Sequence, residues 1–378
     1  MSEGEICARH YATGKSVRLR WQHGKITHLE PAPTSASDDL WLAPALFDPQ
    51  INGYGGIDFQ KDELTTDDLL SATRQLRAAG CTRFLLTLIT DAWPKLTARL
   101  HRLRNLRSQS PELESAIVGW HMEGPFLSPE PGFHGAHEPA LMLSPTAAHV
   151  QELRAITGND PLLLTMAPER PGTLEAIACA TALGIKVSLG HTNASAETLG
   201  QAVSAGATGF THLGNGCPRE LDRHDNILWR VLETPGLTVS LIPDLIHVSP
   251  APFRLIHRLL RAKAIYYTTD AMAAAGAPPG RYRLGRTEVE VGPNQIVRQP
   301  GKTNFAGSAL RPIDGVFRAA RMLNRPWQEV WDRSSRAPAD LLGLVSGLEP
   351  GEQADFCLLK ISDADALSDL KVYASGKA

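Results

Sequence analysis

Three residues whose side chains commonly bind metal ions stand at or near the ends of short apolar segments. They are Glu123, His191 and His212. A carboxylate at the end of a buried strand is costly unless a cation pairs with it. One Glu and two His that converge form a three-ligand site with room for water, which is the pattern of catalytic zinc. The residue types and their positions therefore predict a metal site.

Asp270 ends a further apolar segment and has a different chemical role in this prediction. A water molecule acidified by a metal needs a base that takes its proton and passes it to a leaving group. Asp270 is the candidate for that base. Other polar residues at comparable positions are Gln50, Asn52, Asn215, Asp244 and His247.

Each of these residues also has a structural interpretation, which stays open from the residues alone. Glu123 can pair with a nearby Lys or Arg, and Asp270 can cap the helix that follows it. A single His at a strand end is more often structural. Asn52, Asn193 and Asn215 can be turn residues. Joint placement on one rim favours the metal site.

Eight apolar strands alternate with amphipathic helices between residues 42 and 336. The strands are predicted at 42–51, 82–89, 116–122, 162–167, 186–189, 209–213, 237–242 and 264–269, and the helices at 64–79, 94–105, 144–156, 173–183, 196–205, 251–261, 312–323 and 327–336. This alternation predicts an α/β fold, a closed (β/α)8 barrel of the TIM type with its active site at the C-terminal strand ends. A doubly wound open sheet is less favoured because no Gly-x-Gly-x-x-Gly turn follows the first strand.

The two ends of the chain carry short β segments that flank the barrel. We expect them to form one small β-sandwich domain from residues 1–41 and 346–378, with the catalytic barrel at 42–345. The Gly- and Pro-rich segment 275–301 is predicted to leave the barrel after its last strand and to return at 304–308.

Composition excludes several classes of partner. The chain has 378 residues and a formal net charge of −2, which gives no electrostatic case for binding nucleic acid or an anionic membrane. Its apolar runs are too short to span a bilayer, and the first residues lack a signal-peptide pattern. Basic residues on the helix 94–105, among them Arg99, are expected to form a solvated face.

The five cysteines are odd in number, widely spaced and without a Cys-x-x-Cys pair. That pattern argues against a disulfide framework and against a cysteine zinc site. It predicts a reducing cytoplasm as the location. Cys217, although near the predicted site, is expected to pack.

A series of short motifs runs along nearly the whole chain. They lie at residues 47–56, 80–82, 87–90, 121–126, 135–139, 166–169, 188–194, 211–215, 244–248, 269–271, 307–310 and 348–355. In this order they resemble the N-acetylglucosamine-6-phosphate deacetylases, a family of the metal-dependent amidohydrolase superfamily.

The resemblance implies roles for the residues at the metal site. It implies that Glu123, His191 and His212 bind one divalent metal ion, most often zinc, with iron, manganese, cobalt and nickel as the other candidates. It implies that Asp270 is first the general base and then the general acid. His137 matches the family residue that polarises the acetamide carbonyl.

The resemblance also implies contacts with the rest of the substrate. Asn215, the backbone of Gly216, and His247 match positions around the sugar phosphate. Arg223 matches an arginine contributed by the neighbouring subunit, which implies a homodimer. Leu310 matches a residue that lines the acetyl pocket.

Two places differ from patterns common among the relatives. Many superfamily members carry His-x-His after the first strand, which binds a second metal, but here the place holds Gln50-Ile51-Asn52. Amides are poor ligands beside imidazole, so a single-metal site is favoured. After His212, a run of an aromatic residue and Asn-Ala-Met is replaced by 214–217, Gly-Asn-Gly-Cys.

The sequence therefore predicts a hydrolase that deacetylates N-acetylglucosamine 6-phosphate to glucosamine 6-phosphate and acetate. One alternative is a related amidohydrolase acting on an unphosphorylated or N-acetylgalactosamine-type sugar. Another is a non-catalytic sugar-phosphate-binding homologue, against which the complete Glu-His-His-Asp set argues.

Overall fold

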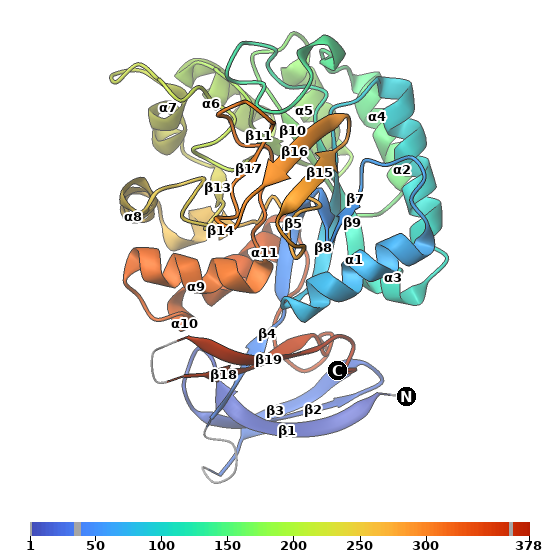
Figure 1. Ribbon diagram of the computed structural model, residues 1–378, viewed down its shortest axis with the longest axis vertical. Helices are drawn as coiled ribbons and strands as arrows, with labels where there is room; N and C mark the ends of the chain where they lie inside the picture. The colour runs from blue at the N-terminus through green and yellow to red at the C-terminus, as the bar shows by residue number, and fades with distance from the viewer. Residues whose placement is uncertain (1, 34–38, 363–365) are drawn as a thin grey trace.

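A parallel eight-stranded sheet forms the centre of the computed structural model, which describes residues 2–33, 39–362 and 366–378 (Figure 1). In chain order the strands are β5 (Leu46–Ile51), β8 (Cys81–Ile89), β9 (Ile117–Glu123), β10 (Leu162–Met166), β11 (Lys186–Leu189), β12 (Gly209–Phe210), β13 (Thr238–Leu241) and β14 (Ile265–Tyr267). Each strand pairs with the next, and a parallel bridge between Ile51 and Ala271 joins the first strand to the segment after the last. The predicted (β/α)8 barrel is confirmed.

Helices surround this sheet, and five of those described begin after a residue whose side chain caps the first turn. The helices are α1 (Thr66–Ala78), α2 (Trp93–Arg107), α3 (Pro111–Ala116), α4 (Ala147–Thr157), α5 (Thr173–Ala182), α6 (Ala196–Ala205), α7 (Ile227–Glu233), α8 (Pro250–Leu259), α9 (Pro312–Leu323), α10 (Gln328–Trp331) and α11 (Arg336–Leu341). Thr65 forms a capping box with Asp68 at the start of α1, and Ser195 caps α6. No helix among the described residues is long and apolar enough to cross a membrane.

The expected first strand, 42–51, is two strands in different sheets. β4 (Leu40–Pro44) pairs with terminal strands, whereas β5 belongs to the barrel. The change occurs at one peptide: the Ala45 N–H donates to Asp355 O, and the next N–H, that of Leu46, donates to Gly80 O. Both halves are apolar and mostly buried, so their composition does not mark the division.

Two other expected elements are shorter or broken. The strand expected at 209–213 ends at Phe210, because the backbone turns into a left-handed conformation at His212. The helix expected at 327–336 is instead α10, a 3-10 turn at Asp332–Ser334, and α11. Ser335, with φ −128° and ψ −74°, interrupts the helical backbone between them.

The two chain ends form a second sheet of six strands. It contains β4 together with β1 (Glu3–His10), β2 (Ser16–Gln22), β3 (Lys25–Pro31), β18 (Phe356–Ile361) and β19 (Leu367–Tyr373). Figure 1 shows the C-terminal strands lying between the N-terminal strands and the barrel. Trp21 packs against Phe356 and Tyr373, with ring centroids 5.2 and 5.6 Å away. The small β domain built from both ends is confirmed.

The precise division of the chain into 1–41 with 346–378, and 42–345, stays a prediction. Residues 1, 34–38 and 363–365 of the predicted small domain lie outside the described residues.

The segment after β14 forms a three-stranded antiparallel sheet, as the expected excursion from the barrel. Its strands are β15 (Gly280–Leu284), β16 (Thr287–Val291) and β17 (Val297–Arg298), drawn in orange across the front of the barrel in Figure 1. The turn between β15 and β16 is tied down: Gly285 N–H donates to Asp58 Oδ2 at 2.9 Å, and Arg286 pairs with Asp91 at 2.6 Å.

The expectation of a solvated basic face on α2 is wrong for Arg99. Its side chain is only 3% exposed and forms ion pairs with Asp62 and Asp91, at 2.9 and 3.0 Å. Asp62 comes from the loop before α1 and Asp91 from the loop before α2, and the two carboxylates hold the guanidinium away from solvent.

Candidate metal centre

The three predicted metal ligands converge at the C-terminal end of the barrel. Glu123 is the last residue of β9, and its Oε1 lies 2.8 Å from His212 Nε2 and 3.5 Å from His191 Nε2. One ligand atom from each of the three residues lies within 4.8 Å of the other two. All three side chains are buried, and the cluster has the size and donor set of a three-ligand metal site with one carboxylate and two imidazoles.

Backbone strain is concentrated at this cluster. His191, His212 and Asp270 all have positive φ, at 50°, 33° and 50°. The left-handed region is unfavourable for residues with a Cβ, at a cost on the order of 1 kcal/mol or more each. Each residue follows a barrel strand closely, and the unusual backbone turns its side chain toward the common site.

The His191 ring has one orientation and one tautomer that satisfy its surroundings. Its Nδ1 lies 2.9 Å from the Phe133 carbonyl oxygen, which can only accept, so Nδ1 carries the proton. Nε2 then presents a lone pair toward Glu123, as a metal ligand requires. Two glycines in the left-handed region pack on the ring: a Cβ at Gly135 would lie 2.8 Å from Cε1, and one at Gly216 would lie 3.0 Å from Nδ1.

Asp270 is held by the two amides that replace the His-x-His motif. Its Oδ1 accepts hydrogen bonds from Gln50 Nε2 at 3.0 Å and from Asn52 Nδ2 at 2.7 Å. Gln50 Nε2 also donates to Glu123 Oε1 at 2.9 Å. The two amides therefore act as hydrogen-bond donors to these carboxylates, and the Gln50 NH2 group joins Glu123 to Asp270.

The electrostatics of the two carboxylates fit a bound cation. Burial acts to raise the pKa of Glu123, but hydrogen bonds and charges from His191 and His212 hold it well below the usual range. Burial and the charge of Glu123 raise the pKa of Asp270 to about 8. In the described parts of the chain, no Lys or Arg is found bonded to either carboxylate. A divalent ion among these ligands would supply the missing positive charge.

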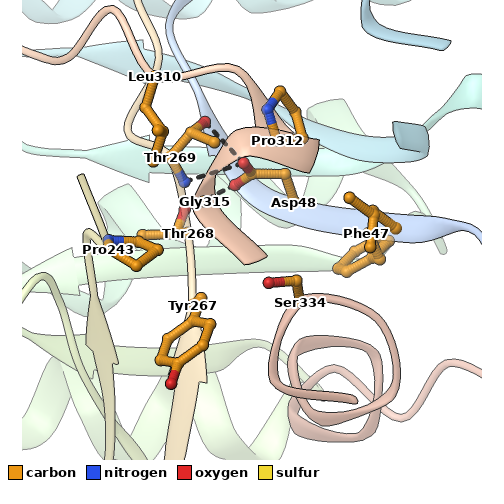
Figure 2. Close-up of a pocket in the computed structure, with 11 residues that line it drawn as sticks. Phe47, Asp48, Pro243, Tyr267, Thr268, Thr269, Leu310, Pro312, Gly315 and Ser334 are labelled. Carbon is orange, nitrogen blue, oxygen red and sulfur yellow. Dashed lines mark hydrogen bonds between the residues drawn. The ribbon is translucent and has the colours of Figure 1, made fainter. Parts of the chain in front are cut away.

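Asp48 supports Asp270 from behind, a role that sequence reasoning missed. Its carboxylate accepts hydrogen bonds from the Thr268 hydroxyl at 2.6 Å and from both the N–H and the hydroxyl of Thr269, at 2.9 and 2.6 Å (Figure 2). Thr269 directly precedes Asp270. The sequence does show an acidic residue, Asp48, in an apolar segment two residues before Gln50. It does not show the partners of Asp48, which lie more than 200 residues away in the chain.

His137 lies beside the ligands without being one of the three. Its Nε2 is 3.8 Å from Glu123 Oε2, and its ring centroid is 4.6 Å from that of His191. The other nitrogen, Nδ1, lies 2.9 Å from Thr90 Oγ1. Burial and the charge of neighbouring histidines lower the pKa of His137 to about 3, so the ring is neutral near pH 7.

Polar groups without partners surround the centre. His247 Nδ1 lies 2.6 Å from Asp244 Oδ2, whereas its Nε2 is buried with no hydrogen-bond partner among the described residues. Asn215 Nδ2 is buried and unpartnered in the same sense. Buried polar groups are normally hydrogen-bonded, so these two atoms are suited to a polar ligand. Asp244, which orients His247, carried no role in the sequence prediction.

Two predicted site residues are not among those that contact the cluster. Arg223 is exposed in the loop before α7. Leu310 is buried, and its side chain lines a small cavity beside Asp48, together with Pro243 and Gly315 of α9 (Figure 2).

Two further residues near the centre, His121 and Cys217, contact residues of the barrel interior and the core. His121 is buried on β9, and its Nε2 lies 2.8 Å from Thr165 Oγ1 inside the barrel. Cys217 is unpaired and packs against the core, and burial raises the pKa of its thiol to about 11.

Comparisons with known proteins find relatives that match most of the chain. The chain is 31% identical over 331 residues to N-acetylglucosamine-6-phosphate deacetylase of Vibrio furnissii, covering 86% of this chain and 80% of the relative. It is 30% identical to N-acetylgalactosamine-6-phosphate deacetylase of Escherichia coli O157:H7, covering 90% of each.

A solved structure is similar over the full length. It is an aspartate-to-alanine mutant of N-acetyl-D-glucosamine-6-phosphate deacetylase from Mycobacterium smegmatis, in complex with N-acetyl-D-glucosamine-6-phosphate, with a TM-score of 0.87 and 28% identity over 100% of this chain and 99% of that one. No family model matches the chain.

Proposed function

Because the chain belongs to the N-acetylglucosamine-6-phosphate deacetylase family, we propose that it hydrolyses the N-acetyl amide of N-acetylglucosamine 6-phosphate, giving glucosamine 6-phosphate and acetate. The observation that carries this proposal is the buried cluster of Glu123, His191 and His212, with Asp270 joined to it through Gln50. Together they would supply a metal site and a nearby base, joined by one amide side chain, which are the groups that hydrolysis of an amide requires.

Glu123, His191 and His212 are the residues that would hold one divalent metal ion, with zinc as the first candidate. Bound there, the ion would supply a positive charge that acidifies a water molecule and polarises the amide carbonyl. The lone pair of His191 Nε2 is available for this role because Nδ1 donates to Phe133 O.

Asp270 moves the proton. Its Oδ1 accepts from Gln50 and Asn52, and no hydrogen bond to Oδ2 is found within the described residues, so Oδ2 can take a proton from the attacking water. The same oxygen then gives the proton to the amide nitrogen, so that the C–N bond breaks with a neutral amine leaving. The Thr269 hydrogen bonds to Asp48 keep the backbone of Asp270 in place during both transfers.

His137 stabilises the negative charge that develops on the acetyl oxygen. A proton on Nε2, which faces Glu123 and the centre, can be donated to that oxygen as it becomes an oxyanion.

The sugar phosphate contacts the polar groups on the other side of the centre. Asn215, the Gly216 N–H and His247 are the proposed contacts, supported by the unpartnered Nδ2 of Asn215 and Nε2 of His247. Leu310, which lies in the loop before α9, is proposed to line the acetyl pocket.

We also propose a homodimer in which Arg223 reaches the phosphate in the neighbouring subunit. Its exposed position, in the loop that leads to the half-exposed Trp229 on α7, supports this. The proposed compartment is the cytoplasm, supported by five unpaired cysteines.

The first test is Asp270→Asn, assayed for acetate release and for metal content. We expect stoichiometric metal and a loss of turnover of at least about a thousandfold, since the proton transfers lose their carrier. Normal turnover would refute the role of Asp270. In parallel, His191→Ala should lose the metal, and a fully metallated His191→Ala protein would exclude it as a ligand.

A second candidate substrate is N-acetylgalactosamine 6-phosphate, favoured by the 30% identical relative that carries that name. Rates on both sugars, with and without the 6-phosphate, separate the candidates. Arg223→Ala should raise KM for the phosphorylated sugars only, with the exposed Arg219→Ala as the matched control. Equal rates with and without the phosphate would contradict the phosphate contacts.

A further inference from the structure

The hydroxyl of Thr90 lies between the His137 ring and the turn that follows Glu123. Thr90 comes directly after β8, is 8% exposed, and its Oγ1 lies 2.9 Å from His137 Nδ1. On the other side, Gly124 has φ 95° and approaches so closely that a Cβ there would overlap Oγ1. Three segments distant in sequence therefore meet at one hydroxyl group.

The residues on both sides of Thr90 are fixed. The Ile89 N–H donates to Gln60 Oε1 at 3.1 Å. Asp91 forms ion pairs with the buried Arg99 at 3.0 Å and with Arg286 at 2.6 Å. The backbone therefore holds the Thr90 side chain in one place, as a group that orients another side chain must be held.

The partner of Nδ1 decides which nitrogen of a neutral imidazole carries the proton. His191 and His137 differ in this respect although their rings are adjacent. The partner of His191 is a carbonyl oxygen, which accepts, so the proton lies on Nδ1. The partner of His137 is a hydroxyl group, which can donate.

Nδ1 of His137 is the one hydrogen-bond partner found for Thr90 Oγ1 within the described residues. If Nδ1 donated, the Thr90 proton would be buried without an acceptor, which costs about 1–3 kcal/mol. His137 Nε2 would then also direct a lone pair at the Glu123 carboxylate, 3.8 Å away. Donation from Thr90 to Nδ1 avoids both penalties.

We propose that Thr90 is a positioning residue that donates its hydroxyl proton to His137 Nδ1, which places the His137 proton on Nε2, facing the reacting carbonyl. The inference rests on the proposed function only for its effect on catalysis, because the tautomer itself is a property of the resting protein. Thr90 touches no reacting atom and acts through His137.

The kinetic test compares Thr90→Val, which keeps the shape and removes the hydroxyl, with Thr90→Ser, which keeps the hydroxyl. On N-acetylglucosamine 6-phosphate we expect Thr90→Val to lower kcat about 10–100-fold, with metal content unchanged and KM little affected. Thr90→Ser should restore most of the rate. Thr73→Val is the matched control, because Thr73 is a buried threonine on α1 whose hydroxyl has no partner.

A double-mutant cycle tests whether Thr90 acts through His137. In a His137→Ala background, Thr90→Val should cause no further loss of kcat. Losses that multiply, or a Thr90→Ser variant as slow as Thr90→Val, would overturn the proposal.

The direct test is the tautomer of His137, read from side-chain nitrogen NMR of zinc-loaded protein labelled at histidine. The signals are assigned by their loss in His137→Ala. We expect the proton on Nε2 in the wild type and a shift toward Nδ1 in Thr90→Val. A proton on Nδ1 in the wild type refutes the proposal whatever the activity, whereas an inactive wild type with the proton on Nε2 refutes only the proposed function.

Discussion

Replacing the partly buried carboxyl of Asp270 with an amide should stabilise the metal-free protein. The carboxyl is partly buried near Glu123, and its pKa is raised from 3.8 to about 8. An acid with a raised pKa in the folded state is stabilising while it is protonated. That contribution is fully present below pH 3.8 and is lost as pH rises through about 8.

The size of the effect follows from the shift. Each unit of pKa corresponds to about 1.4 kcal/mol, so ionising Asp270 destabilises the metal-free fold by up to about 6 kcal/mol above pH 8. Local relaxation and entry of water reduce such penalties, so we expect a measured gain of about 2–4 kcal/mol for Asp270→Asn. The Asn oxygen can still accept from Gln50 and Asn52, so the hydrogen bonds of the carboxylate Oδ1 are kept.

The assay is thermal unfolding in the presence of a chelator, from pH 4 to pH 9. The variant and the wild type should unfold at similar temperatures near pH 4, and the variant should gain progressively up to about pH 8. Asp340→Asn, at an exposed carboxyl on α11, should show no such trend. Two parallel curves for Asp270→Asn and wild type would refute the reasoning, because the carboxyl would then ionise without a penalty. Adding metal should remove most of the difference, since a nearby cation favours the charged carboxylate.

Two further predictions concern the surroundings of the centre. Gly135→Ala places a Cβ 2.8 Å from the His191 ring at φ 59° and should weaken metal affinity about 10–100-fold, measured by competition with a chelator; Gly301→Ala, at φ 74° with open space, should leave the affinity unchanged. Asp91→Ala removes one partner of a buried guanidinium and should cost about 3 kcal/mol in urea unfolding. Arg286→Ala removes the exposed partner of Asp91 and should cost less than about 1 kcal/mol. Equal losses of unfolding free energy for the two variants would contradict the distinction between the buried pair and the exposed pair.

The convergence of Glu123, His191 and His212 was predictable because a parallel barrel brings all its strand ends to one face. For such a fold, a residue's type and its place at a strand end are enough to put it on the rim. The same logic put Asp270, Gln50 and Asn52 on this rim, and the structure shows that Gln50 and Asn52 donate hydrogen bonds to Asp270 there. Whether these residues bind metal and move protons stays a proposal that the experiments above test.

Thr90 and Asp48 could not be found in this way. Each acts through a hydrogen bond to a residue far along the chain, His137 for Thr90 and Thr268 with Thr269 for Asp48. A threonine after a strand, or an aspartate within one, has no local pattern that reveals such a partner. The burial of Arg99 was missed for a related reason. The helical pattern of α2 shows which residues face the core, but it does not show that Asp62 and Asp91, which lie in loops, pair with Arg99.

The bridge from Ile51 to the segment after β14 also has a consequence for how the protein is made. It joins parts of the chain that are about 220 residues apart, as do the hydrogen bonds from Gln50 and Asn52 to Asp270. Contacts between such distant segments form late, because a long loop must be closed before they contribute. A chain emerging from the ribosome exposes Glu123, His191 and His212 well before Asp270. The proposed metal ligands are therefore synthesised first, and the proposed proton carrier meets Gln50 and Asn52 only when the barrel closes.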